Sequence, residues 1–171
     1  MRHFAVTALL ICALAVPSPL LPGTRPKPPT SPPAWFWGCW VVTKALPITA
    51  IVGIGPKKEK AIIGTRIVFT PTRARSGKAV VESPAYRVTE LSADEFWNLG
   101  RYPLSQIGIR APRVTQVSLD LPGNMSDLDF PGNYVYLRKK DIVIDVENVA
   151  FLAVKAKAGD PACACSSRET K

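Results

Sequence analysis

Hydrophobic and polar residues alternate along several stretches of the chain. In residues 115–121 every second residue is valine or leucine, residues 141–147 repeat the alternation with isoleucine and valine, and residues 65–70 follow it as well. Successive side chains of a strand point to opposite faces, so the pattern predicts antiparallel strands with one buried and one solvated face. On this basis Asp145 and Glu147 lie on an outward strand face.

Further strands are predicted where aromatic and β-branched residues gather between turn residues. These segments are residues 37–43, 48–54, 79–82, 86–90, 133–137 and 149–155. The polar run 138–141 separates two apolar segments and indicates a hairpin. Ser92 and Glu95 have the spacing of a capping box, which predicts a helix that ends at Gly100. A second short helical turn is expected at residues 103–107, before Gly108.

These elements predict an all-β fold with little helix. We expect a single antiparallel β-barrel of about eight strands with one or two short helices, because closure into a barrel removes exposed sheet edges. A β-sandwich is the alternative. The predicted domain covers residues 35–159, which is long enough to bury one hydrophobic core.

The residues before this domain have a different composition. Residues 1–15 match a secretory signal peptide, with a positive start, an apolar run and the cleavage pattern Ala13-Leu14-Ala15. The apolar run is too short for a membrane-spanning helix, so no transmembrane anchor is expected. Residues 16–34 contain eight prolines and form a proline-rich spacer. We therefore expect an exported protein, secreted, periplasmic or at the cell envelope. Cleavage after Ala15 is the first expectation, and processing with lipidation at Cys12 is the alternative.

Three cysteines follow the signal segment: Cys39, Cys163 and Cys165, the last two in the polar tail 160–171. An exported domain is expected to oxidise them. Cys163 and Cys165 are too close in sequence to pair without strain. The prediction is a disulfide from Cys39 to either Cys163 or Cys165.

The sequence offers no catalytic motif. Its single histidine, His3, lies in the signal segment, which excludes Ser-His and Cys-His nucleophilic pairs and histidine-ligated zinc from the mature chain. A carboxylate pair could still serve a hydrolase. Its candidates are Glu82, Glu90, Asp94, Glu95, Asp127, Asp129, Asp145 and Glu147. We predict no catalytic residue and no cofactor.

Two stretches have weak resemblance to ligand loops. Residues 122–132 could hold calcium through Asn124, Asp127 and Asp129, but the full ligand pattern is missing, and we interpret them as an ordinary loop without a metal site. Residues 53–58 are rich in glycine and lysine, yet Pro56 removes a backbone donor that a phosphate loop needs. We interpret them as a turn between strands with solvated lysines.

The chain is basic, with 22 lysines and arginines against 13 acidic residues and a net charge of +9. Basic clusters at residues 57–60, 73–78 and 138–140 fall on predicted turns. This balance favours anionic partners such as anionic glycans, lipid head groups or acidic proteins. No nucleic-acid partner is expected, because aromatic residues do not interleave with the clusters.

Gly38-Cys39-Trp40 on the first predicted strand resembles the Gly-x-Trp near the start of the calycin barrels, the lipocalins and their relatives. The resemblance implies an up-and-down barrel whose cavity binds a small, mostly apolar ligand. It also implies that Trp40 closes one end of the barrel beside a basic side chain from the last strand. Lys155 or Lys157 would take that place.

Two main functions fit these observations. The first is a non-enzymatic binding module for a small apolar or anionic ligand, with Trp40, Phe69 and Tyr86 as wall residues. The second is a cell-envelope interaction or inhibitor-type domain that uses its exposed basic turns. An envelope hydrolase is a third alternative, and the oligomeric state stays open. A cavity favours the first function, and a filled core with a basic face favours the second.

Overall fold

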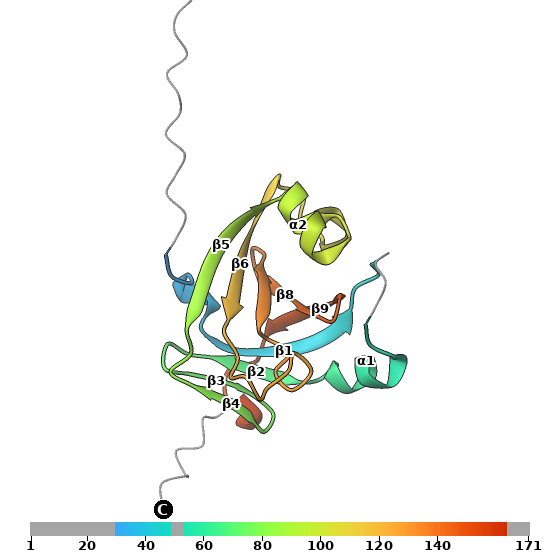
Figure 1. Ribbon diagram of the computed structural model, residues 1–171. Helices are drawn as coiled ribbons and strands as arrows, with labels where there is room; N and C mark the ends of the chain where they lie inside the picture. The colour runs from blue at the N-terminus through green and yellow to red at the C-terminus, as the bar shows by residue number, and fades with distance from the viewer. Residues whose placement is uncertain (1–29, 49–52, 164–171) are drawn as a thin grey trace, which may run out of the picture.

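A computed structural model describes residues 30–48 and 53–163 of the chain, and within them the structure is dominated by strands (Figure 1). The strands are β1 (Gly38–Ala45), β2 (Arg66–Phe69), β3 (Arg73–Ser76), β4 (Ala79–Glu82), β5 (Tyr86–Ser92), β6 (Arg113–Leu119), β7 (Tyr134–Leu137), β8 (Asp141–Val146) and β9 (Val149–Lys155). The α-helices are α1 (Pro56–Ile62) and α2 (Ala93–Gly100), and the 3₁₀ helices are η1 (Ala34–Phe36), η2 (Leu104–Ile107) and η3 (Pro161–Cys163).

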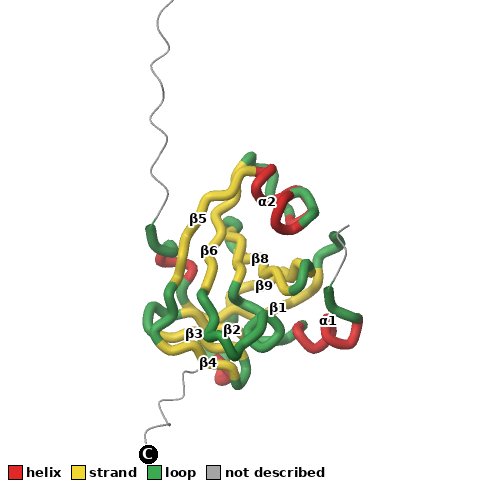
Figure 2. Tube along the Cα trace, in the orientation of Figure 1, coloured by secondary structure: helices red, strands yellow, loops and turns green. Residues whose placement is uncertain are grey.

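The nine strands form one antiparallel sheet in the order β4-β3-β2-β1-β9-β8-β7-β6-β5. Strands that follow one another in sequence therefore pair, apart from β4 and β5, and the first and last strands also pair with each other. The opening lies between β4 and β5, which form the two edges. The sheet curls into a half barrel (Figure 2), so the prediction of an all-β, barrel-like antiparallel fold is confirmed.

The main hydrophobic core fills the concave side of the sheet. It contains side chains from both halves of the strand order, such as Trp40, Phe69, Val117 and Phe151, together with Phe36 from η1. The alternation in β6 and β8 places Val117 and Ile144 in this core, as predicted. Because strands distant in sequence contribute to one interior, this cluster holds the curled sheet together.

A second core covers the part of the convex side that β5–β9 form, and the expectation of a solvated face is wrong there, although Glu147 is exposed as predicted. Phe96 of α2 and Tyr102 pack on Tyr136 and Val143 of the sheet, and all four are buried. Asp145, expected on an outward face, is half-buried and accepts a 2.5 Å hydrogen bond from the Tyr102 hydroxyl. The reason is that the connection between β5 and β6 folds back as α2 and η2 over this face (Figure 1).

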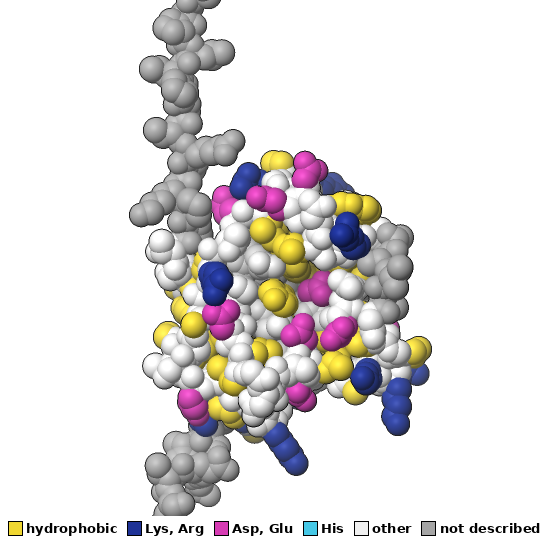
Figure 3. All heavy atoms as spheres, viewed as in Figure 1, with side chains coloured by type: hydrophobic (Ala, Val, Ile, Leu, Met, Phe, Trp, Pro, Cys, Tyr) yellow, Lys and Arg dark blue, Asp and Glu magenta, His cyan; other side chains and the backbone are white. Residues whose placement is uncertain are grey.

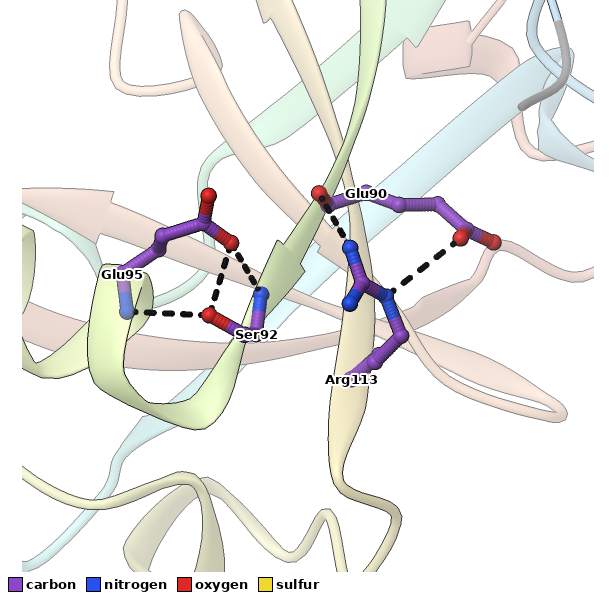
Figure 4. Close-up of polar contacts among 4 residues, drawn as sticks. All are labelled: Glu90, Ser92, Glu95 and Arg113. Carbon is purple, nitrogen blue, oxygen red and sulfur yellow. Dashed lines mark hydrogen bonds and ion pairs between the residues drawn. The ribbon is translucent and has the colours of Figure 1, made fainter. Parts of the chain in front are cut away.

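Local signals at the two helical segments between β5 and β6 are confirmed. Glu95 Oε2 accepts a 2.6 Å hydrogen bond from the Ser92 backbone N–H, and the Ser92 hydroxyl accepts from the Glu95 N–H (Figure 4). These bonds complete the capping box and hold the pKa of Glu95 below its usual value. The helix ends at Gly100, and η2 ends before Gly108, whose positive φ of 74° suits glycine.

Two other segments differ from the sequence prediction. The basic stretch at residues 73–78 is not simply a turn, because Arg73–Ser76 forms β3 and directs Ala74 into the core. Residues 53–58 lead into α1, which Pro56 begins, and proline is well suited to a first helical position because its missing N–H has no partner there. Of the predicted strand 48–54, residues 49–52 lie outside the described residues, and the others are not in a strand.

The C-terminal part of the domain is joined to its first strands. Cys39 and Cys163 form a disulfide with a Cα–Cα distance of 5.7 Å, which selects one of the two predicted pairings. Asp160 adds an ion pair with Arg66 of β2 at 2.8 Å. Cys165 and the signal segment 1–15 lie outside the described residues, as does most of the proline-rich spacer. Within the described part of the chain, no helix has the length and apolarity to span a membrane.

Candidate ligand-binding groove

The three aromatic residues predicted as ligand walls lie in the concave core. Trp40 and Phe69 are fully buried, and Tyr86 is half-buried. Phe36 stacks on Phe69 with ring centroids 4.7 Å apart and contacts Tyr86 edge to face at 6.1 Å. The structure thus brings Phe69 and Tyr86 together around Phe36, whereas the ring contact of Trp40 is with Trp35.

The side chains of Trp40 and Lys155 donate hydrogen bonds to backbone carbonyls at the end of η1. This 3₁₀ helix places Phe36 in the core. The Trp40 indole N–H donates to the Phe36 carbonyl at 2.8 Å, and the Lys155 ammonium donates to the carbonyls of Phe36 and Trp37. The same ammonium lies 4.2 Å from the centre of the Trp40 ring, which is cation–π geometry. Partial burial lowers the pKa of Lys155.

The Gly-x-Trp triplet has a local steric explanation. Gly38 has a φ of 122°, and a Cβ atom there would lie 3.1 Å from Lys155 Nζ. Glycine therefore leaves room for the lysine that caps the Trp40 ring. The contact between Trp40 and Lys155 that the calycin resemblance implies is present.

Trp40, Phe69 and Tyr86 line neither of two surface hollows that lie among the described residues. Tyr86 instead donates its hydroxyl to the Thr70 carbonyl at 3.0 Å, and its burial raises its pKa. The smaller hollow, of about 300 Å³, lies between α1 and the loop before β7. The larger has a volume of about 1120 Å³ and is the candidate site. We call it the mouth groove.

The mouth groove is built from four short segments, which belong to three stretches distant in sequence. They are the residues before and in η1 (Ser31, Pro33, Trp35), residues 108–111 after η2, the start of β6, and the turn from β7 to β8. Thr115 and Leu137 in its lining share strand faces with Val117 and Val135 of the concave core. The groove therefore lies where the half barrel opens to solvent above its packed interior.

The groove has an apolar floor. Its lining includes Trp35, Ile109, Val114 and Leu137. Val114 is buried and Ile109 and Leu137 are half-buried, but Trp35 keeps 41% of its surface exposed. Trp35 rests against the buried Trp40, with ring centroids 6.2 Å apart. An exposed tryptophan on a rigid support is a typical anchor for an apolar ligand group.

Two of the five basic side chains that line the groove are held by neighbours. Arg138 Nη1 donates to the Ile107 carbonyl at 3.2 Å, and its Nε lies 2.9 Å from Asp141. Gly108 allows this close approach, since a Cβ atom there would lie 3.1 Å from the guanidinium. Arg113 lies 3.6 Å from the Glu90 carboxylate and donates to its backbone carbonyl (Figure 4).

The other three basic side chains carry uncompensated charge. Arg110, Lys139 and Lys140 are exposed, and none of them makes an ion pair with another described residue. Asp141, the acidic residue in the lining, is paired with Arg138. The rim therefore attracts anions. The face drawn in Figure 3, in contrast, shows acidic side chains near its centre and separate basic side chains around them.

Sequence reasoning identified part of this site. The prediction of a turn at residues 138–140 is confirmed, and Lys139 and Lys140 are exposed as expected, whereas Arg138 is half-buried. Trp35, Ile109 and Arg110 were missed. Trp35 directly follows the proline-rich spacer, and its place at the domain boundary was the one signal that could have indicated exposure.

Most of the carboxylates considered for a hydrolase have structural partners. Burial raises the pKa of Asp145 above its usual value, although bonds from Tyr102 and the Asn148 N–H oppose this. Five other candidate carboxylates also contact a neighbour. Two form ion pairs, Glu82 with Arg73 and Glu90 with Arg113. Three accept hydrogen bonds, Glu95 from Ser92, Asp127 from Asn133 and Asp129 from Ser126. Within the described ranges, no three histidine, cysteine or acidic side chains are grouped so that they could hold a metal ion.

Comparison of the chain with protein-family models, with curated proteins and with solved structures found no match. The relation to calycin barrels therefore stays a prediction that rests on Gly38-Cys39-Trp40.

Proposed function

We propose that this protein is an exported, non-enzymatic binding module that holds a ligand with an apolar part and an anionic part in the mouth groove. The observation that carries the proposal is the set of three uncompensated cations, Arg110, Lys139 and Lys140, around an apolar floor. The signal-like segment 1–15 and the Cys39–Cys163 disulfide support export, since disulfides persist in oxidising compartments.

Both parts of the ligand have a physical reason to bind. Apolar surface that leaves water against Trp35 and Leu137 gains about 25 cal/mol per Å². A negative charge near the rim gains Coulomb energy, and the gain weakens with added salt because the rim is exposed. The concave interior is occupied by Trp40, Phe69 and Phe36, so the ligand lies at the mouth and not between those rings.

A calycin-like ancestry is part of the proposal. It is supported by the up-and-down strand order, by the pairing of β1 with β9 and by the contact of Trp40 with Lys155. The filled interior would then be the departure from the family pattern, with the binding surface moved to the mouth.

Calorimetric titration of the mature protein with dodecyl phosphate, in parallel with uncharged dodecyl maltoside, tests the proposal. We expect binding of the phosphate and little heat from the maltoside. The Lys139→Glu/Lys140→Glu variant is expected to lose about tenfold in affinity, whereas Lys57→Glu on α1, which removes an exposed lysine away from the groove, is expected to bind normally. Equal binding by both variants would contradict the assignment of the groove.

A further inference from the structure

The mouth groove is large and open for a small-molecule site. Its volume of about 1120 Å³ exceeds the roughly 300 to 1000 Å³ of typical ligand pockets, and one side is open to solvent. A pocket for a small ligand usually encloses most of that ligand. This size and shape suit a segment of a larger molecule that lies along the groove.

The polar groups of the groove also differ from those of a small-ligand pocket. Such pockets direct a few buried polar groups at one point. Here none of the polar side chains in the described lining is fully buried, and the uncompensated cations come from separate segments. Arg110 follows η2, whereas Lys139 and Lys140 belong to the turn between β7 and β8. A ligand with several separated negative charges can reach all three.

An apolar centre within a charged rim is the arrangement of a protein–protein interface. Tryptophan and arginine are enriched in the residues that contribute most to such interfaces. Trp35 is half-exposed in the lining, Arg138 is fixed by Ile107 and Asp141, and long basic side chains surround them. An acidic partner complements this charge, and a basic partner is repelled by it.

We propose that the occupant of the mouth groove is an acidic segment of a partner protein, with an aromatic or aliphatic side chain that packs on Trp35. This inference rests on the proposed function and narrows its ligand class. Arg110, Lys139 and Lys140 pair with carboxylates of the segment, which raises the association rate and makes binding dependent on salt. Arg113 and Arg138 mainly hold the groove in shape through Glu90 and Asp141.

Fluorescence anisotropy with a labelled, glutamate-rich peptide that contains one phenylalanine and one leucine tests the inference on the mature, oxidised protein. We expect saturable binding that weakens as salt is added. The Lys139→Glu/Lys140→Glu variant should lose about tenfold or more in affinity. Trp35→Ala should also bind the peptide more weakly, while Lys57→Glu and Trp97→Ala, which change exposed residues outside the groove, should match the wild type.

The competing outcomes separate the two proposals. If dodecyl phosphate binds and depends on Lys139 and Lys140 but the peptide does not bind, the proposed function stands and the acidic-segment inference is wrong. Vesicles of anionic phospholipid are the third probe. If the protein binds only these vesicles, the acidic-segment inference is wrong and the groove faces a membrane surface. If none of the three probes binds, both proposals are wrong. A lysine-rich peptide that binds as well as the glutamate-rich one would also overturn the inference.

Discussion

Trp35 and Trp40 are five residues apart, and their rings are in contact, yet their surroundings are opposite. Trp40 is fully buried, donates its indole N–H to Phe36 and lies under the Lys155 ammonium. Trp35 is 41% exposed and lines a groove with a basic rim. The strand β1 directs Trp40 into the barrel, whereas η1 turns Trp35 to its mouth. Residue type alone therefore does not separate a packing residue from a binding residue.

The largest expected effect is on stability at the buried tryptophan. Trp40→Ala removes a fully buried ring and leaves the Phe36 carbonyl with fewer donors, so we expect a loss of about 3–5 kcal/mol in the free energy of unfolding. Urea denaturation measures it. A loss similar to that of Trp35→Ala would break the distinction between the two tryptophans.

The disulfide joins β1 to η3, near the C-terminal end of the described residues. Cys163→Ser opens a bridge between residues 124 apart in sequence, and we expect a loss of about 2–4 kcal/mol under oxidising conditions. Cys165→Ser is the matched control and should leave the unfolding free energy unchanged. If Cys165→Ser loses more unfolding free energy than Cys163→Ser does, Cys165 is the true partner of Cys39. Peptide binding by folded Cys163→Ser should match the wild type, since neither cysteine lines the groove.

The groove also depends on the layer over the convex face, because residues 108–111 directly follow η2. Tyr102→Phe removes the hydrogen bond to Asp145, and bonds to charged groups contribute about 1.5–3 kcal/mol. Thermal and urea unfolding should show this loss, and Tyr134→Phe, at an exposed site, should show almost none. Equal effects would mean that the Tyr102 hydroxyl contributes nothing to the docking of η2.

The burial of Asp145 predicts a pH dependence. Burial raises the pKa of Asp145, helped by the nearby Asp127 and Glu147, so the folded protein holds this proton more tightly than the unfolded chain. Its contribution to stability therefore falls as the pH rises from the unfolded pKa, near 3.9, through the raised folded pKa. The Asp145→Asn variant has no carboxyl group at this position, so its unfolding free energy should not fall with pH for this reason. Urea denaturation across that range should show the wild type losing stability relative to the variant, and parallel curves would contradict the burial effect.

The smallest expected effect on stability is at the exposed tryptophan. Trp35→Ala should cost about 1 kcal/mol or less, because much of the ring already faces solvent, but it should weaken binding in the groove. Trp97→Ala on α2 is the control, since Trp97 is 48% exposed and does not line the groove. A Trp35→Ala protein that binds as the wild type does would remove Trp35 from the site.

The alternation of side chains predicted most of the sheet, because a buried strand face has a clear sequence period. It did not predict the second core. Val143 and Val114 looked like ordinary strand residues, and only the return of α2 and η2 over the convex face buries them. That covering depends on contacts between residues distant in sequence, such as Tyr102 with Asp145, which no local pattern contains.

The candidate site was less predictable, for a related reason. The prediction of Trp40, Phe69 and Tyr86 as ligand walls rests on the frequency of large aromatic residues in ligand cavities. In the structure Phe36 from η1 contacts both Phe69 and Tyr86 and fills the space between them. The three uncompensated cations become a group only through folding. Arg110 and Lys139 are far apart in sequence, and ion pairs of Arg113 and Arg138 decide which charges remain available.

The most direct test of the account follows the tryptophan indole N–H and the backbone amide signals in NMR spectra of the mature protein. The spectra are recorded during titration with the glutamate-rich peptide and with dodecyl phosphate. Ligand in the mouth groove predicts the largest shift at Trp35, with shifts at the backbone amides of Arg110 and Lys139. The buried Trp40 signal should move less. The largest shifts at the Trp40 indole N–H and at the backbone amides of Phe69 and Tyr86, with the Trp35 indole signal unchanged, would place the ligand inside the barrel and contradict the account.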